Sequence, residues 1–416
     1  MIFMETFDAY LNDLVNQNRD TFSAWPNLKW LNFSSAAEAQ QQRDRLTKGL
    51  EGNWLFKETK PYYNRISEGC KICGLGGWSC LFITGKCNGS CFYCPAPQLT
   101  DDVPTTQNLK FATPEAYAGY IRFFRFKGVS FSGGEPLLFF DRTLQYLKQI
   151  RKNNPDIYIW MYTNGILGDE QKFRKLAAAG LNEVRFDIGA TGFKLGKIKA
   201  AKGIVPNITI EIPAVPEEKQ RLKQLLPEMI HAGVTNLNLH QLRLTKHNVA
   251  RLSEHDYTYI PAEQPIVLES ELAALEIISH ARQNNLDIGI NYCSFFFKNR
   301  FQKAGFRKQI ANALAGPDEI ITQKGFIREL NENTIGYKTI TISDEKNDSP
   351  NTEELKLPHK TFFISRETVM KKTVFEKEQK LPLEEIVKNE PSKIPTDPFL
   401  FDVWQKEYIE KGLREY

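Results

Sequence analysis

Between about residue 80 and residue 293, short runs rich in β-branched and aromatic residues alternate with longer amphipathic runs. The short runs predict strands, and they are LFITG at 81–85, VSFSG at 129–133, IYIWMYT at 157–163, VRFDI at 184–188, ITIEI at 208–212, TNLNLH at 235–240 and DIGINY at 287–292. Several of the longer runs begin with Asp, Pro or Thr and end in Gly or Asn, as helices do. Alternation at this spacing requires parallel strands joined by right-handed crossovers. The sequence therefore predicts an α/β fold of six or seven units, a partial (β/α)6 TIM-like barrel.

Cysteine, glycine and polar residues follow the ends of these predicted strands. In a parallel barrel, the chemistry gathers at the carboxyl ends of the strands. The residues expected at this mouth are Cys87, the turn Gly133-Gly134-Glu135-Pro136, Asn164, Asp187, the turn Pro213-Ala214-Val215-Pro216, His240 and Cys293.

The patterns before and after the barrel differ from it and predict three parts. Residues 1–69 show apolar residues at helical spacing and predict a mostly helical N-terminal extension, and residues 70–315 form the barrel. Residues 316–416 predict a small α+β appendage, with strands at GYKTITIS, HKTFFIS and TVMKKTVF, the polar loop DEKNDSPNTEE, and a closing helix at FLFDVWQKEYIEKGLREY.

Composition and the N-terminus favour a cytoplasmic protein. The net charge of +4 is too small to indicate nucleic-acid binding. No run approaches the ~20 apolar residues of a membrane span, and the N-terminus lacks the basic start and apolar core of a signal peptide. Of seven cysteines, six lie between residues 70 and 94. In the cytoplasm this density indicates metal binding before disulfides.

The strongest motif is Cys87-Asn-Gly-Ser-Cys91-Phe-Tyr-Cys94, a CxxxCxxC directly after a predicted strand. Three thiolates can hold a [4Fe–4S] cube and leave its fourth iron open to another ligand. The alternative is a structural zinc, which takes four protein ligands, usually in paired spacings. The triplet is one ligand short of that, so its spacing favours the cluster.

The motif resembles the CxxxCxΦC signature of the radical S-adenosylmethionine (SAM) superfamily, with Tyr93 at the aromatic position. Ser132-Gly133-Gly134-Glu135-Pro136, about 40 residues further on, is similar to the GGE motif of the same superfamily. The resemblance implies a cluster on Cys87, Cys91 and Cys94 and a SAM amino group bound at Ser132–Glu135. It also implies reductive cleavage of SAM to methionine and a 5′-deoxyadenosyl radical, with a flavodoxin- or ferredoxin-type electron donor.

Residues 80–315 look most similar to radical SAM proteins related to pyruvate formate-lyase activating enzymes. Tyr162-Thr163-Asn164-Gly165 resembles a strand-three turn of that group, Asp187 a strand-four acid, and the segment around Val215 a strand-five stretch near the adenine. His240 closes strand six. Glu211 departs from the Arg expected beside that stretch. The resemblance thus adds Asn164, Asp187, Val215 and His240 to the expected cofactor-binding residues.

The four other cysteines leave three alternatives open. Cys70, Cys73, Cys80 and Cys293 equal the number that a second iron–sulfur cluster, an iron or a zinc requires. However, Cys80 opens strand one, about 20 Å from the mouth at ~3.3 Å per residue, whereas Cys293 lies at the mouth. Cys293 could instead act in catalysis as a hydrogen-atom donor or radical relay. All four could also be ordinary buried cysteines.

A basic helical segment follows Cys293, with Lys298, Arg300, Lys303, Arg307 and Lys308. It is either a solvated face or an anion site, in which case Lys298 and Gln302 are the candidates. The substrate is a peptide or protein, slightly favoured, or a small molecule; RNA is less expected. The alternative function is a zinc-stabilised barrel acting as a non-catalytic binding module.

Overall fold

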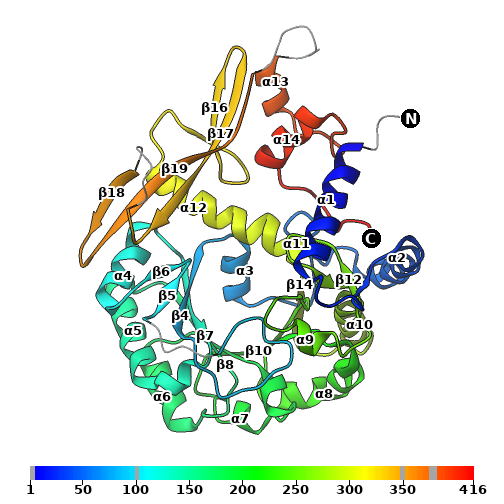
Figure 1. The fold of residues 1–416 in the computed structure, drawn as a ribbon. Coiled ribbons are helices and arrows are strands. Elements are labelled where there is room, and N and C mark those ends of the chain that lie inside the picture. The colour runs from blue at the N-terminus through cyan, green and yellow to red at the C-terminus, as the bar shows by residue number, and fades with distance from the viewer. Residues whose placement is uncertain (1–4, 99–102, 347–351, 374–381) are drawn as a thin grey trace.

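In the computed structural model, which describes residues 5–98, 103–346, 352–373 and 382–416, seven parallel strands form an open arc (Figure 1). They are β4 (Trp78–Thr84), β7 (Gly128–Gly133), β8 (Tyr158–Thr163), β9 (Glu183–Phe186), β10 (Asn207–Pro213), β11 (Asn236–His240) and β14 (Gly289–Cys293). Each neighbours the next in chain order, and every pairing is parallel. Every predicted strand overlaps one of them, so the predicted partial barrel is confirmed.

The arc does not close, because antiparallel strands cover its two edges. On the β14 edge lie β3 (Lys60–Tyr63) and β2 (Trp54–Leu55), and on the β4 edge lie β5 (Thr105–Thr106) and β6 (Leu109–Lys110). Short added strands of this kind protect exposed sheet edges. β2 and β3 belong to the segment predicted as a mostly helical extension. Besides its helices, that segment therefore supplies part of the barrel sheet.

Helices cover the outer face of the arc (Figure 1). They are α4 (Pro114–Phe123), α5 (Phe140–Asn153), α6 (Glu170–Ala178), α7 (Gly196–Lys199), α8 (Lys219–His231) and α10 (Leu268–Gln283). The sequence signals for their starts are visible: Thr113 and Asp169 accept backbone hydrogen bonds as caps of α4 and α6. Between helices and sheet, Leu81, Ile83 and Phe131 are completely buried in the main core.

One helix lies inside the arc. α3 (Glu68–Gly74) is enclosed by the strands in Figure 1 and contacts β7, β8 and the π-helix η5 (Lys298–Lys303). Gly69 permits this, because a Cβ there would stand 2.3 Å from a guanidinium nitrogen of Arg185. Cys70 and Cys73 are thereby brought to the interior of the barrel.

The remaining N-terminal elements pack beside the β14 end. They are α1 (Glu5–Thr21), α2 (Phe33–Thr47) and η1 (Lys48–Leu50), with β1 (Lys29–Trp30) pairing to β12 (Thr258–Ile260), which in turn pairs with β13 (Ile266–Val267). The small helix α9 (Val249–Leu252) precedes β12.

The C-terminal part is an α+β unit, as predicted. α11 (Phe295–Phe297), η5 and α12 (Ala304–Leu314) lead into a five-stranded sheet of β15 (Ile320–Ile321), β16 (Ile327–Asn331), β17 (Thr334–Ser343), β19 (Lys360–Thr373) and β18 (Thr352–Leu357). HKTFFIS and the TVMKKT part of the next predicted strand are one strand, β19, because no turn residue separates them. The rest of that second run lies outside the described residues. α13 (Leu383–Lys388) and α14 (Pro398–Glu407) complete the unit.

Within the part of the chain that the structure describes, no helix has both the length and the apolar character that crossing a bilayer requires.

Candidate active site

A cavity of about 900 Å³ lies inside the arc. Its walls come from the strands, the loop after β4, α3 and the segment after β14, and all seven cysteines line it: Cys70, Cys73, Cys80, Cys87, Cys91, Cys94 and Cys293. Cys80 and Cys293 were expected at opposite depths of the barrel. They share one cavity because the space extends down the inner face of β4 as well as across the strand ends.

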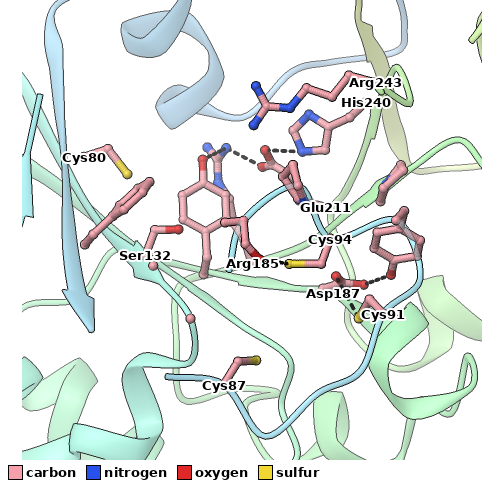
Figure 2. A pocket seen from close by; sticks show the side chains of 18 of the residues that line it. Cys80, Cys87, Cys91, Cys94, Ser132, Arg185, Asp187, Glu211, His240 and Arg243 are labelled. Atoms are coloured by element: carbon pink, nitrogen blue, oxygen red, sulfur yellow. Dashed lines mark hydrogen bonds and ion pairs between the residues drawn. The ribbon is translucent and has the colours of Figure 1, made fainter. Parts of the chain in front are cut away.

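Cys87, Cys91 and Cys94 lie on the loop that follows β4, and Figure 2 shows them along one side of the cavity. Arg251 of α9 holds this loop by donating to the carbonyl oxygens of Cys91, at 3.0 Å, and Cys94, at 3.4 Å. Asn248 donates to the carbonyl oxygen of Tyr93 at 3.1 Å. The loop is therefore anchored through its backbone, which leaves the thiols directed to the cavity.

Nitrogen donors lie next to two of the three sulfur atoms. The Gly89 amide is 3.3 Å from Cys87 Sγ, Asn164 Nδ2 is 3.7 Å from the same sulfur, and Gln98 Nε2 is 3.4 Å from Cys94 Sγ. Hydrogen bonds to the sulfurs are among the features that tune protein-bound iron–sulfur clusters. Burial raises the pKa of the Cys91 thiol to about 12, so the free thiol stays protonated and iron must displace its proton on binding.

The thiols fit a cluster better than a single ion. Over the described residues, no three His, Cys, Asp or Glu side chains gather closely enough to hold one metal ion. A zinc would need four such ligands around one point. A [4Fe–4S] cube is wider than one ion and takes its thiolates at separate corners. The same finding means that Cys70, Cys73, Cys80 and Cys293 do not assemble a second mononuclear site in this structure.

The two glycines of the GGE turn pack against the cysteine loop. The amide of Gly134 donates to the Thr84 carbonyl at 2.7 Å, and that of Glu135 to the Lys86 carbonyl at 2.8 Å. A Cβ on Gly134 would lie 1.9 Å from the carbonyl oxygen of Lys86, and Gly133 has a φ of +115°. Only glycine allows both features. Ser132, Gly133 and Gly134 line the cavity next to Cys87.

Glu135, predicted as a ligand of the SAM amino group, does not line this cavity. Its side chain is completely buried and accepts from the Leu137 amide at 2.9 Å, the Thr163 hydroxyl at 2.8 Å and the Asn164 amide at 2.7 Å. With both oxygens occupied, the carboxylate joins the end of β7 to the end of β8. Through the Asn164 amide it fixes the backbone at the end of β8.

Tyr93 and Asp187 form a pair beside Cys91. The Tyr93 hydroxyl donates to Asp187 Oδ1 at 2.7 Å, and Asp187 also accepts from the Gly189 amide at 3.0 Å. Burial raises the pKa of Asp187. Val215, predicted near an adenine, does not line the cavity; it is buried in an apolar cluster against which Tyr93 packs.

A chain of buried polar side chains that contains one ion pair crosses the opposite wall (Figure 2). Arg185 Nη1 lies 2.6 Å from Glu211 Oε2, and Glu211 Oε1 lies 2.9 Å from His240 Nε2. Despite burial, the positive charge of Arg185 and the hydrogen bonds from His240 and Asn238 hold the pKa of Glu211 far below its ordinary value. Glu211, found where the resemblance led us to expect Arg, is therefore the partner of an arginine on the neighbouring strand.

Arg185 was missed as a site residue. Glu183, Arg185 and Asp187 alternate along β9, so all three face the barrel interior. The sequence signal for Arg185 was this alternation of charged residues at every second position of a predicted strand. An arginine on the inner face of a buried strand needs a partner of opposite charge there.

The inner end of the cavity combines thiols with amines and amides. Lys60 Nζ lies 2.6 Å from Cys293 Sγ, Asn238 Nδ2 lies 3.0 Å from Cys70 Sγ, and Gln302 Nε2 lies 2.9 Å from Cys73 Sγ. Lys298 and Gln302, the candidates from the basic segment, both line the cavity. Lys60 had no sequence signal, because it lies on a four-residue edge strand outside the predicted barrel.

Comparison with known proteins gives one family match and one clear relative. Residues 81–226 match the model of the Radical SAM superfamily. A protein of Methanocaldococcus jannaschii, provisionally named as a glycyl-radical enzyme activating enzyme, is 28% identical over 285 residues, which are 66% of this chain and 75% of the relative.

Similar solved structures include three proteins. Escherichia coli HemN, a coproporphyrinogen III oxidase described as a radical SAM enzyme, shows 10% identity and a TM-score of 0.35, with 67% of this chain and 71% of HemN covered. SuiB of Streptococcus suis, solved with its precursor peptide SuiA, shows 11% identity and a TM-score of 0.42. The similarity covers 77% of this chain and 71% of SuiB. The methyltransferase TsrM of Kitasatospora setae shows 14% identity and a TM-score of 0.33. The similarity covers 49% of this chain and 45% of TsrM.

Proposed function

We propose, on the premise that residues 81–226 are a domain of the radical SAM superfamily, that this enzyme binds a [4Fe–4S] cluster through Cys87, Cys91 and Cys94 and cleaves SAM reductively. When bound, the cluster and SAM would supply a 5′-deoxyadenosyl radical able to take a hydrogen atom from the substrate. The single observation that carries the assignment is the anchored loop after β4, whose three thiols line the cavity, with nitrogen donors at the sulfurs of Cys87 and Cys94.

The residues around this loop support a binding place for SAM. The backbone of Ser132, Gly133 and Gly134 lines the cavity next to Cys87 without side-chain bulk, so it can approach the methionine part closely. Asn164, Asp187 and His240 line the same space and are proposed to orient the nucleoside and methionine groups. Tyr93 contributes by holding Asp187.

Cys293 is proposed to act after hydrogen abstraction. A carbon-centred product radical takes the hydrogen atom of the thiol, which forms a C–H bond and leaves a thiyl radical. One electron from a flavodoxin- or ferredoxin-type donor and one proton then restore the thiol. The proposal is supported by the position of Cys293 at the end of β14, in the cavity and 2.6 Å from Lys60.

For the substrate, we favour a peptide or protein segment over a free small molecule. The provisional name of the archaeal relative supports this choice, since an activating enzyme acts on another protein. The same name supports a separate reductant as partner.

The test uses protein purified and reconstituted without oxygen. Wild-type protein should contain four iron and four sulfide per chain from the cluster, and with dithionite and SAM it should form 5′-deoxyadenosine. Cys91→Ala should lose both, whereas Ser90→Ala, at an exposed position of the same loop, should keep both. Zinc without iron or sulfide in the wild-type protein would contradict the proposal and favour a non-catalytic binding module.

A further inference from the structure

We propose that the inner end of the cavity binds a carboxylate group of the substrate, through the ammonium groups of Lys60 and Lys298. The inference rests on the proposed function in one respect, which is that the cavity is the place where the substrate meets SAM. The carboxylate is that of a peptide chain end or of an acidic side chain.

Lys60 is a buried cation without an acidic partner. It is 1% exposed, lines the cavity, and contacts Cys293 Sγ at 2.6 Å and the ring of Phe297 at 4.5 Å. No Asp or Glu of the described chain makes an ion pair with it. An ammonium group has three N–H donors, and a sulfur is a weak acceptor for one of them. A charge buried in this way is costly unless an anion joins it.

Lys298 lies on another element, η5, and its ammonium group likewise has N–H donors that no acidic side chain of the described residues accepts. Its Nζ lies 3.1 Å from His240 Nδ1, and His240 Nε2 lies 2.9 Å from Glu211. Because Nε2 must donate to the carboxylate, Nδ1 is the acceptor for Lys298, so the imidazole is neutral. Burial, and then the charge of Lys298, lower the pKa of His240, in agreement with this tautomer. The other N–H groups of Lys298 stay available to the cavity.

The acids of the cavity are already engaged. Of the charged residues that line it, four are Lys or Arg (Lys60, Arg185, Arg243 and Lys298) and two are Asp or Glu (Asp187 and Glu211). Glu211 is taken by Arg185, Asn238 and His240, and Asp187 by Tyr93 and Gly189. The aromatic rings of Phe295 and Phe297 flank the two lysines and limit water there. A substrate carboxylate would meet an excess of positive charge in a low-dielectric setting.

This place is separate from the proposed cluster. Lys60 and Lys298 belong to β3 and η5, next to β14, whereas the cluster loop follows β4, and β4 and β14 are the two outermost parallel strands. The donors to the sulfurs of Cys87 and Cys94 are Gly89, Asn164 and Gln98, and within the described part of the chain none of them hydrogen-bonds to either lysine. SAM bound near Ser132–Gly134 would meet this place at His240, which contacts Lys298, and would leave the two ammonium groups to the substrate.

The experiment measures how a probe carboxylate protects Cys293 from alkylation. Anaerobic, cluster-containing protein is treated with iodoacetamide, and the modified Cys293 peptide is quantified by mass spectrometry. N-acetylglycine models a chain end, N-acetylglutamate α-amide models an acidic side chain, and N-acetylglycinamide is the uncharged control. At least one of the two acids should protect Cys293 in a saturable manner, and the better one identifies the source of the carboxylate. The amide should not protect.

Variants assign the effect to the two lysines. Lys60→Met and Lys298→Met should each raise the half-protective acid concentration at least tenfold, and Lys60→Arg and Lys298→Arg should retain part of the protection. Lys303→Met is the matched control on the same π-helix, because Lys303 is exposed and pairs with Glu263 at 3.1 Å. It should behave as wild type. Iron and sulfide content, measured for every variant, identifies any that fail to fold, and the Arg variants then carry the test.

Three outcomes would overturn the inference: no saturable protection of wild type by either acid, equal protection by the amide, or unchanged protection in both Met variants. Formation of 5′-deoxyadenosine by the same wild-type preparation is measured in parallel. If no 5′-deoxyadenosine forms, the proposed function alone is contradicted, because thiol protection is measured without SAM. If 5′-deoxyadenosine forms but neither acid protects Cys293, the carboxylate site alone is contradicted.

Discussion

At the scale of single residues, the cavity wall depends on one buried guanidinium. Arg185 donates to Glu211 at 2.6 Å and to Glu183 at 3.2 Å, and all three side chains are almost inaccessible to solvent. Removing one member of a buried ion group leaves uncompensated charge, which costs more than the intact group contributes. Glu211 in turn fixes His240 and, through it, Lys298.

We expect Arg185→Met to lower the free energy of unfolding by about 3–5 kcal/mol, because Glu183 and Glu211 lose their counter-charge inside the barrel. Urea unfolding of the anaerobic protein measures this. Arg174→Met is the control: Arg174 pairs with Glu170 on the surface of α6, with both side chains more than half exposed, and should cost about 0–1 kcal/mol. An equal loss of free energy of unfolding in the two variants would mean that the buried ion group contributes no more to stability than a surface ion pair.

Low pH tests the same group. The charge of Arg185 and the hydrogen bonds from His240 and Asn238 depress the pKa of Glu211 in the folded protein, against the effect of burial. A carboxyl with a depressed pKa contributes stability above its unfolded pKa of about 4.3, and that contribution is lost as the pH falls toward the folded value. The stability difference between wild type and Glu211→Gln should therefore be constant above about pH 5 and shrink below about pH 4 in urea unfolding series. A difference that grows on acidification would contradict the ionised state of Glu211.

Individual residues were predictable where a motif marks them and not where the partner lies on another strand. Cys87, Cys91 and Cys94 follow from their spacing, as does the GGE turn. The inward role of Glu135 was not visible, because its three donors come from residues 137, 163 and 164, and only the fold brings the last two to it. Lys60 could not be linked to Cys293, which is 233 residues away in the chain.

At the scale of elements, the turn after β7 and the loop after β4 form one rigid joint. Gly134 and Glu135 donate backbone hydrogen bonds to Thr84 and Lys86, so the two strand ends are fastened where Cys87 begins its loop. The absence of a side chain at residue 134 sets this spacing.

Gly134→Ala should therefore displace the cysteine loop. The new Cβ would meet the Lys86 carbonyl at 1.9 Å, and backbone cannot move away as a side chain can. We expect a loss of about 1–3 kcal/mol in stability, the usual cost of overpacking, together with a lower iron content after reconstitution. Gly196→Ala, at a glycine with open space around its Cβ position and no positive φ, is the matched control and should change neither. Full iron content in Gly134→Ala would show that the joint does not position Cys87.

The strands of the barrel were predictable from sequence because each is a local run of four to seven residues followed by a helical segment. The elements that were missed are short or depend on distant pairing. β2, β5 and β6 have two residues each and exist through their neighbours in the sheet. The segment of α3 was recognised only by its CxxC cysteine pair. Its seven residues contain no pattern that indicates a helix packed inside the barrel.

At the scale of the whole molecule, the predicted parts 1–69, 70–315 and 316–416 are connected through the last residues of the chain. Arg300 of η5 donates to the Gly412 carbonyl at 2.6 Å and pairs with Glu410. The Gly412 amide donates to the Lys57 carbonyl at 2.7 Å, and Arg43 of α2 lies over the ring of Tyr416 at 4.0 Å. The C-terminal tail thus joins the N-terminal segment to the π-helix that carries Lys298, a connection that no local pattern could indicate.

Deleting residues 408–416 should loosen η5 and α2 together while leaving the strands intact. The deletion leaves Arg300, which is 4% exposed, without Glu410 and the Gly412 carbonyl, and an unpaired buried charge favours local opening. We expect amide hydrogen exchange in residues 298–303 to speed up at least tenfold, equivalent to about 1.4 kcal/mol, with unchanged exchange in β7 and β8. Lys411→Met is the control, because Lys411 pairs with Glu58 at the surface and its loss should leave exchange in η5 unaltered. If the truncated protein kept full protection in η5, the π-helix would be held by its packing inside the barrel, and the carboxylate site at Lys298 would not depend on the tail.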